Sequence, residues 1–248
     1  MKFISITQLW WQLLLFIIGS YLIGSINFAV IISKLKKRDI RSIGSGNPGT
    51  LNMSRNFGIG IGVLTLVLDI VKGIVPTLTA MLVYNSYFFE GTTLGVGLFA
   101  KVTCGFFVVL GHVFPIFMKF KGGKGIATTI GVFAVCNIWI AIISGVIAVV
   151  FILFTEIGSM GSFIATTPGA IATCYSVCMD YIYNQPLGVD SGLLAGLSNL
   201  FVVLIIVLTW YAHRKNIERL IAGEEHPTNW LQMIKESVLK KRNKKSKS

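Results

Sequence analysis

Long apolar stretches are the feature that most restricts how this chain can fold. Apolar runs with few charges cover residues 8–33, 59–84, 93–118, 126–155, 162–180 and 193–212. Runs of about 20 apolar residues need lipid around them, because water does not tolerate so much exposed apolar surface. The first run lacks a small-residue cleavage site, so we expect it to be retained as a span. The sequence predicts an all-α polytopic membrane protein with residues 1–225 as one domain.

The distribution of charge predicts the orientation. Basic residues gather in three segments, at 34–41, at 119–124 and from 214 to the end. The positive-inside rule assigns all three to the cytoplasm. The run at 126–155 therefore needs an even number of crossings, and we predict that it breaks near Cys136 and Asn137 and crosses twice. This gives seven transmembrane helices in the plasma membrane, with the N-terminus outside and the C-terminus cytoplasmic.

The net charge of +12 does not indicate a nucleic-acid partner, because the basic residues flank membrane spans instead of covering a soluble face. We expect residues 226–248 to form a basic cytoplasmic tail, disordered at its end and close to anionic membrane lipids. The four cysteines lie in apolar runs without a nearby histidine, so no metal site is expected.

A basic glycine loop separates two of the apolar runs. Residues 119–125 place three lysines among three glycines, and the sequence predicts a helix that starts near Ile126. Lysines, close backbone approach and the positive end of a helix all favour a bound phosphate. A nucleotide-binding P-loop would need Gly at position 118 and Ser or Thr at 125, where Met118 and Gly125 stand. The alternative is a loop that only sets orientation.

Two other cytoplasmic segments carry similar chemistry. The first, residues 34–58, contains the turn-rich GSGNPG sequence followed by Arg55, whose planar fork suits phosphate. The alternative there is an ordinary linker. The second follows the last apolar run, where His213, Asn216 and Arg219 recur every three residues. A short loop at 155–162 adds serines on the same side.

One ion pair is expected inside a span. Asp69 and Lys72 are three residues apart, so they share a helix face and can neutralise each other. Ionisable residues within a span mark either a site or a structural pair. We interpret this pair as structural.

Three motifs together carry a resemblance to a known family. They are GSGNPGxxNxxR at 44–55, GHxFPxxxxFKGGKGxAT at 111–128 and HRxNIxRLxxGxE at 213–225. In this order they resemble the acyl-phosphate-dependent glycerol-3-phosphate acyltransferases of bacterial membranes. The resemblance runs from about Gly24 to Glu225. It implies a seven-span fold with its active site open to the cytoplasm.

The resemblance also implies a reaction and its residues. The sn-1 hydroxyl of glycerol 3-phosphate would attack a long-chain acyl phosphate, giving lysophosphatidic acid and phosphate, without a cofactor. The enzyme that supplies acyl phosphate would be a partner. The catalytic residues implied are Ser45, Arg55, Lys124, His213 and Asn216. The substrate-binding residues implied are Gly44, Gly46, Asn47, Asn52, His112, Lys121, Gly122, Gly123, Ser162, Arg219 and Glu225.

The chain departs from the family pattern at two places. The family usually reads Gly-Ala-Thr before the Asn of the first motif, where this chain has Gly49, Thr50 and Leu51. It commonly has Pro where Asn27 stands. Losing a hydroxyl at Leu51 puts one substrate hydrogen bond in question.

Three other functions are compatible with parts of the sequence. Intramembrane charges would suit a transporter of an anionic phosphorylated solute, but the two halves of the chain show no repeat. An acyltransferase that uses a thioester donor would need His followed by Asp five residues later, and none of the three histidines has it. A lipid-binding scaffold would not need so many phosphate-suited groups.

Overall fold

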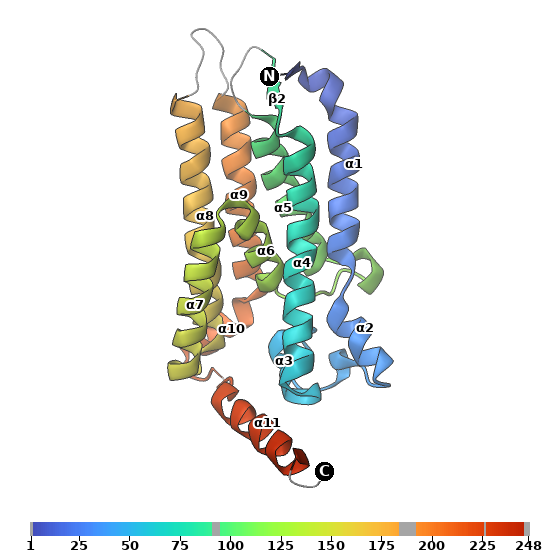
Figure 1. Ribbon diagram of the computed structural model, residues 1–248, viewed down its shortest axis with the longest axis vertical. Helices are drawn as coiled ribbons and strands as arrows, with labels where there is room; N and C mark the ends of the chain where they lie inside the picture. The colour runs from blue at the N-terminus through green and yellow to red at the C-terminus, as the bar shows by residue number, and fades with distance from the viewer. Residues whose placement is uncertain (1, 91–94, 184–191, 226, 246–248) are drawn as a thin grey trace.

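The protein is a bundle of long helices with short helices at one end (Figure 1). The computed structural model describes residues 2–90, 95–183, 192–225 and 227–245. The helices are α1 (Ile6–Ser25), α2 (Phe28–Leu35), α3 (Thr50–Phe57), α4 (Ile59–Tyr84), α5 (Val96–Val113), α6 (Ile126–Cys136), α7 (Ile138–Thr155), α8 (Gly158–Tyr183), α9 (Gly192–Ala212), α10 (Arg214–Ile221) and α11 (Trp230–Lys245). Two short parallel strands, β1 (Lys2–Ile4) and β2 (Tyr87–Phe89), lie at the other end.

The first apolar run forms two helices instead of the predicted one. The break falls at Ile26 and Asn27, and the Asn27 side chain accepts a hydrogen bond from the Val30 amide at the start of α2. Asparagine is a favoured N-cap residue, so it starts a new helix here. The break also frees the Ile26 carbonyl, which accepts a 2.8 Å hydrogen bond from Lys72 Nζ.

The predicted break in the run at 126–155 is confirmed at Asn137, which ends α6 and caps α7. The prediction that both halves cross the membrane is not confirmed for α6. Its 11 residues extend about 16 Å, whereas the apolar part of a bilayer is about 30 Å thick. In Figure 1 α6 and α7 form a hairpin that turns partway along the bundle.

Five helical segments within the described residues are long and apolar enough to cross a membrane, namely Thr7–Leu35, Ile59–Tyr84, Val96–Met118, Ile138–Thr155 and Gly192–Ala212. The helix α8 also has 26 residues but contains more serine and threonine. The helix starts at Gly158, so the expected loop at 155–162 is partly helical.

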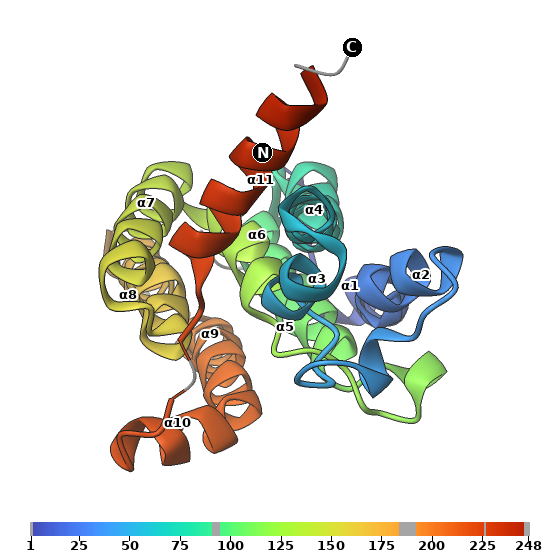
Figure 2. The same cartoon turned by 90° about the horizontal axis from the view of Figure 1, so that it is seen from below.

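Two of the basic segments contain helices that were not predicted from the sequence. The segment 34–58 contains α3, which carries Arg55, while the GSGNPG sequence at 44–49 forms turns outside the helices, as predicted. In the tail, residues 230–245 form α11, which crosses beneath α4 and α7 (Figure 2), and the expected disorder at the end of the tail stays a prediction. The tail residue His226 lies outside the described residues.

Glycines bring the central helices into backbone contact. An added Cβ at Gly24 of α1 would collide with the backbone of Val108 in α5, and one at Gly73 of α4 would collide with Thr128 in α6. Small residues allow such close approach in membrane helices, where lipid gives no hydrophobic driving force for association. These contacts hold α1 against α5, and α4 against α6.

Candidate active site

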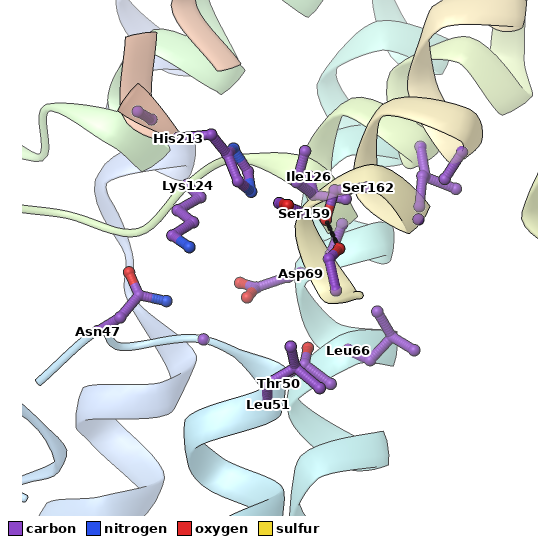
Figure 3. A pocket seen from close by; sticks show the side chains of 18 of the residues that line it. Asn47, Thr50, Leu51, Leu66, Asp69, Lys124, Ile126, Ser159, Ser162 and His213 are labelled. Carbon is purple, nitrogen blue, oxygen red and sulfur yellow. Dashed lines mark hydrogen bonds between the residues drawn. The ribbon is translucent and has the colours of Figure 1, made fainter. Parts of the chain in front are cut away.

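A cavity of about 1580 Å³ opens among the short helices and continues between α4, α6 and α7 (Figure 3). Fourteen of the sixteen predicted site residues line it, and the exceptions are Gly44 and Gly123. Its polar part is lined by side chains from α3, α10 and the loop before α6. The other part, called here the apolar arm, is lined by residues such as Ile70, Ile130, Ile142 and Val146.

Asn52 fixes the GSGNPG loop through hydrogen bonds of its side-chain amide. The Asn52 Oδ1 accepts a hydrogen bond from the Ser45 amide, and its Nδ2 donates to the carbonyls of Ile40 and Ile43. Gly44 and Gly46 have positive φ angles of 59° and 68°, which other residues rarely adopt. The side-chain amide of Asn52 is fully engaged in these hydrogen bonds, and the residue is only 2% exposed. Its structural role is therefore to shape the loop. The Ser45 side chain is exposed and lines the cavity.

The glycines of the second motif have a different role from the one predicted. The amides of Gly122 and Gly123 donate to the carbonyls of Val113 and His112, so they do not face a bound anion. A Cβ on Gly122 would collide with the His112 carbonyl, and one on Gly123 with the His112 ring. These glycines let the loop fold tightly over the end of α5, and this fold turns Lys124 toward the cavity.

Lys124 joins the second motif to the third. Its amine donates a 2.7 Å hydrogen bond to Asn216 Oδ1 on α10. Burial, and then the nearby charge of Arg219, lowers the pKa of Lys124 to about 8. The amine is therefore mostly protonated at pH 7, and it remains a cation suited to phosphate.

His213 caps α10 and lies beside Lys124 (Figure 3). Its Nδ1 lies 2.9 Å from the Thr209 carbonyl, which places the ring proton on Nδ1 and leaves Nε2 as an acceptor. Burial, followed by the charge of Lys124, lowers the His213 pKa to about 4. The ring is neutral at physiological pH.

Two arginines complete the cationic side of the cavity. Arg55 Nη2 donates to the Pro227 carbonyl at 2.9 Å, which ties α3 to the segment after α10. The Nε of Arg219 is buried and has no hydrogen-bond partner among the described residues. A buried donor without a partner is costly, and a ligand oxygen would satisfy it. Lys121 is exposed and also lines the cavity.

The serines of α8 meet the end of the third motif. The hydroxyl of Ser159 donates to Glu225 Oε2 at 2.5 Å, and its amide donates to Oε1 at 3.1 Å. Glu225 is thus bound at the helix start, where the dipole stabilises a negative charge. The predicted Ser162 lines the cavity, but its hydroxyl donates to the Gly158 carbonyl. Ser159 is a lining residue that was not among the predicted site residues.

The expected ion pair of Asp69 and Lys72 is present, with Nζ 2.9 Å from Oδ1. Lys72 also lies 2.9 Å from His112 Nδ1, so the pair supports the end of α5 and the loop that folds over it. Asp69, however, lines the cavity, which the structural interpretation of the pair did not anticipate. Its position inside an apolar span was the sequence feature that could have indicated this.

No metal site appears among the described residues, because no three His, Cys, Asp or Glu side chains lie together. Cys104, Cys136, Cys174 and Cys178 are free thiols.

Comparison with known proteins agrees with the three motifs. The sequence profile of the glycerol-3-phosphate acyltransferases matches residues 14–223. The chain belongs to this family. It is 39% identical over 220 residues to a glycerol-3-phosphate acyltransferase of Mycoplasmopsis pulmonis, covering 88% of this chain and 93% of the relative. It is 34% identical over 214 residues to one of Aquifex aeolicus, covering 86% and 97%.

A solved structure of the acyltransferase family has the same fold. It is an integral membrane glycerol 3-phosphate acyltransferase, PlsY, in its glycerol 3-phosphate form, with a TM-score of 0.69 and 31% identity. The match covers 90% of this chain and 98% of that structure. Together with the long apolar helices, it identifies the chain as a multi-pass membrane protein. The helix α11 lies beyond the residues that the family profile matches.

Proposed function

We propose that this protein transfers a long-chain acyl group from acyl phosphate to the sn-1 hydroxyl of glycerol 3-phosphate. The products are lysophosphatidic acid and inorganic phosphate, and the reaction is the first acylation of phospholipid synthesis. The main support for the proposal is that a single cavity has both a polar, cationic part and an apolar part. Its polar part gathers cations from three motifs, and its apolar arm has an aliphatic lining that suits a hydrocarbon chain.

The polar part suits two phosphorylated substrates. Each carries about two negative charges near pH 7, so they repel each other until cations neutralise them. Arg55, Lys124 and Arg219 supply those cations, and Asn216 holds the amine of Lys124 in place. Fixed charges of this kind stabilise the leaving phosphate as negative charge develops on it.

The apolar arm suits the acyl chain. Ile142 and Val146 of α7 line the arm and are 48% and 58% exposed, so the arm opens toward the outside of the bundle. In a bilayer this opening faces lipid. A lipid-soluble donor would enter from the side, while glycerol 3-phosphate would enter from the cytoplasm, where the basic segments are expected to lie.

The chemistry needs no protein nucleophile. Acyl phosphate is a mixed anhydride whose leaving group is phosphate. The sn-1 oxygen attacks the carbonyl carbon, the carbon–oxygen bond to phosphate breaks, and the departing phosphate takes the hydroxyl proton. Neutral His213, with Nε2 as an acceptor, is suited to orient the attacking hydroxyl. Ser45 is suited to donate a hydrogen bond to a phosphate or carbonyl oxygen.

Purified protein tests the proposal. Palmitoyl phosphate and glycerol 3-phosphate should give lysophosphatidic acid and phosphate in equal amounts, and omission of either substrate should stop both. Palmitoyl-coenzyme A should not replace the donor. Lysophosphatidic acid formed from the thioester alone would contradict the proposed donor. Uptake of glycerol 3-phosphate into proteoliposomes without acyl transfer would favour a transporter instead.

A further inference from the structure

Asp69 is the unexpected charge in this cavity. The charged residues that line the cavity are mostly cations suited to phosphate, whereas a carboxylate repels phosphate. The other lining carboxylate, Glu225, is bound by Ser159. Asp69 is 3% exposed and lines the cavity from α4. Figure 3 shows its carboxylate pointing into the space between α4 and Lys124.

The protein holds this carboxylate firmly in place. Lys72 Nζ lies 2.9 Å from Asp69 Oδ1, and the Lys72 side chain is fully buried. The same amine donates to the Ile26 carbonyl and contacts the ring of His112, which lies 3.8 Å from Asp69. A buried charge is retained only when a partner compensates it, and Lys72 compensates this one.

One oxygen of Asp69 remains for a ligand. Oδ1 faces Lys72 in the ion pair but has no hydrogen-bond donor among the described residues, and none of them donates to Oδ2 either. An ionised carboxylate only accepts hydrogen bonds, so it selects a donor such as a hydroxyl and rejects a phosphate. Glycerol 3-phosphate has both groups, with a phosphate at one end and two hydroxyls at the other.

We propose that Asp69 binds a hydroxyl of the acceptor and is a specificity-determining residue. The cations on one side of the cavity would bind the acceptor's phosphate, and Asp69 on the other side would bind its hydroxyl end. The two opposite charges thus fix the direction in which the acceptor lies and prevent it from binding in reverse. This inference rests on the proposed function, because it takes glycerol 3-phosphate as the acceptor.

The test combines a change in the protein with a change in the ligand. Propyl phosphate has the phosphate of the acceptor but neither hydroxyl. For the unaltered protein, we expect glycerol 3-phosphate to bind at least about tenfold more tightly than propyl phosphate, because a hydrogen bond to a charged group is among the stronger ones. In Asp69→Asn that ratio should fall to about threefold or less. The inhibition constant of inorganic phosphate should change little.

Binding is measured by displacement of radiolabelled glycerol 3-phosphate from purified protein, so the test does not depend on acyl transfer. The double variant Asp69→Asn/Lys72→Met removes both charges of the buried pair and replaces the single variant if that one does not fold. It should show the same reduced ratio of the two affinities. Glu218→Gln removes an exposed carboxylate on α10 outside the cavity and should leave the ratio unchanged.

If a folded Asp69 variant still binds glycerol 3-phosphate about tenfold more tightly than propyl phosphate, the inference is overturned. If the unaltered protein binds glycerol 3-phosphate but forms no lysophosphatidic acid, the proposed function fails while the role of Asp69 is still measured. In kinetics, Asp69→Asn should raise KM for glycerol 3-phosphate by about tenfold and leave KM for acyl phosphate nearly unchanged. Equal increases in both constants would indicate a general structural role.

Discussion

The amine of Lys124 donates a 2.7 Å hydrogen bond to the side-chain oxygen of Asn216. These residues are 92 positions apart, and the bond joins the loop before α6 to α10. It fixes a cation in the middle of the cavity, between the groups of the first and third motifs.

Lys124→Gln should lower kcat/KM for acyl transfer by at least about 100-fold, because a neutral amide cannot neutralise phosphate charge in the transition state. Its helical circular dichroism should be unchanged. Lys36→Gln removes an exposed lysine outside the cavity and is the matched control. Near-normal activity in Lys124→Gln would exclude this amine from the reaction.

Acceptor binding should weaken as the pH rises through about 8. Burial lowers the Lys124 pKa to about 8, so its amine is charged below that pH and neutral above it. The His213 pKa of about 4 means that this ring stays neutral from pH 5 upward. A plot of KM for glycerol 3-phosphate against pH should therefore rise near pH 8 and show no step from His213 near pH 6.5.

Ser45 should not carry the acyl group covalently. Its side chain is exposed in a loop, where its oxygen accepts a 3.4 Å hydrogen bond from the Asn47 amide. A serine nucleophile needs an adjacent base, and the GSGNPG loop itself supplies none. Protein mixed with radiolabelled acyl phosphate alone and then denatured should retain no label, while Ser45→Ala should lose activity. Stoichiometric label that Ser45→Ala abolishes would show a covalent intermediate.

Gly123→Ala should destabilise the protein by about 1–3 kcal/mol, the usual cost of overpacking. The added methyl group would overlap the His112 ring, which is itself fixed by Lys72. Gly196 in α9 is the control, since nothing lies within 4 Å of an added Cβ there. Gly196→Ala should be neutral or slightly stabilising. Equal melting temperatures for the two variants would contradict the packing role of Gly123.

Asn137 should be shielded from the outer solution. In a cysteine-free background, Asn137→Cys should react poorly with an impermeant thiol reagent, because α6 is too short to carry it across the bilayer. Ser86→Cys, in the turn after α4 at the opposite end from the motifs, should react from outside. Equal labelling at both positions would restore the two full crossings predicted from the sequence.

The sequence predicted elements that depend on local chemistry and missed those that depend on packing. The break at Asn137 followed from length and charge, and the start of α6 at Ile126 followed from the preceding glycines. The tight fold of Gly123 over His112 required knowledge of which helix end lies beneath the loop. The exposure of Asp69 to the cavity likewise depends on how far α6 and α7 stand from α4.

The motifs predicted which residues come together, while the roles of those residues stay predictions. The three motifs were predicted to share one face, and Lys124, Asn216 and Arg55 do line one cavity. Asn52 was assigned to substrate, yet its amide group is used to shape the loop that carries Ser45. An amide can serve either purpose, and only its neighbours in the fold decide which.

The glycine contacts also make some helix pairs of the bundle more rigid than others. At Gly24 and Gly73 backbone meets backbone, and such contacts leave no side chain that could change rotamer and absorb a displacement. Across α7 and α8 the close contact at Gly161 is instead with the side chain of Ile152, which can rotate. The wall of the cavity formed by α4 and α6 is therefore stiff, and the wall formed by α7 is compliant. We therefore expect thermal motion that widens the apolar arm to displace α7 instead of α4 or α6.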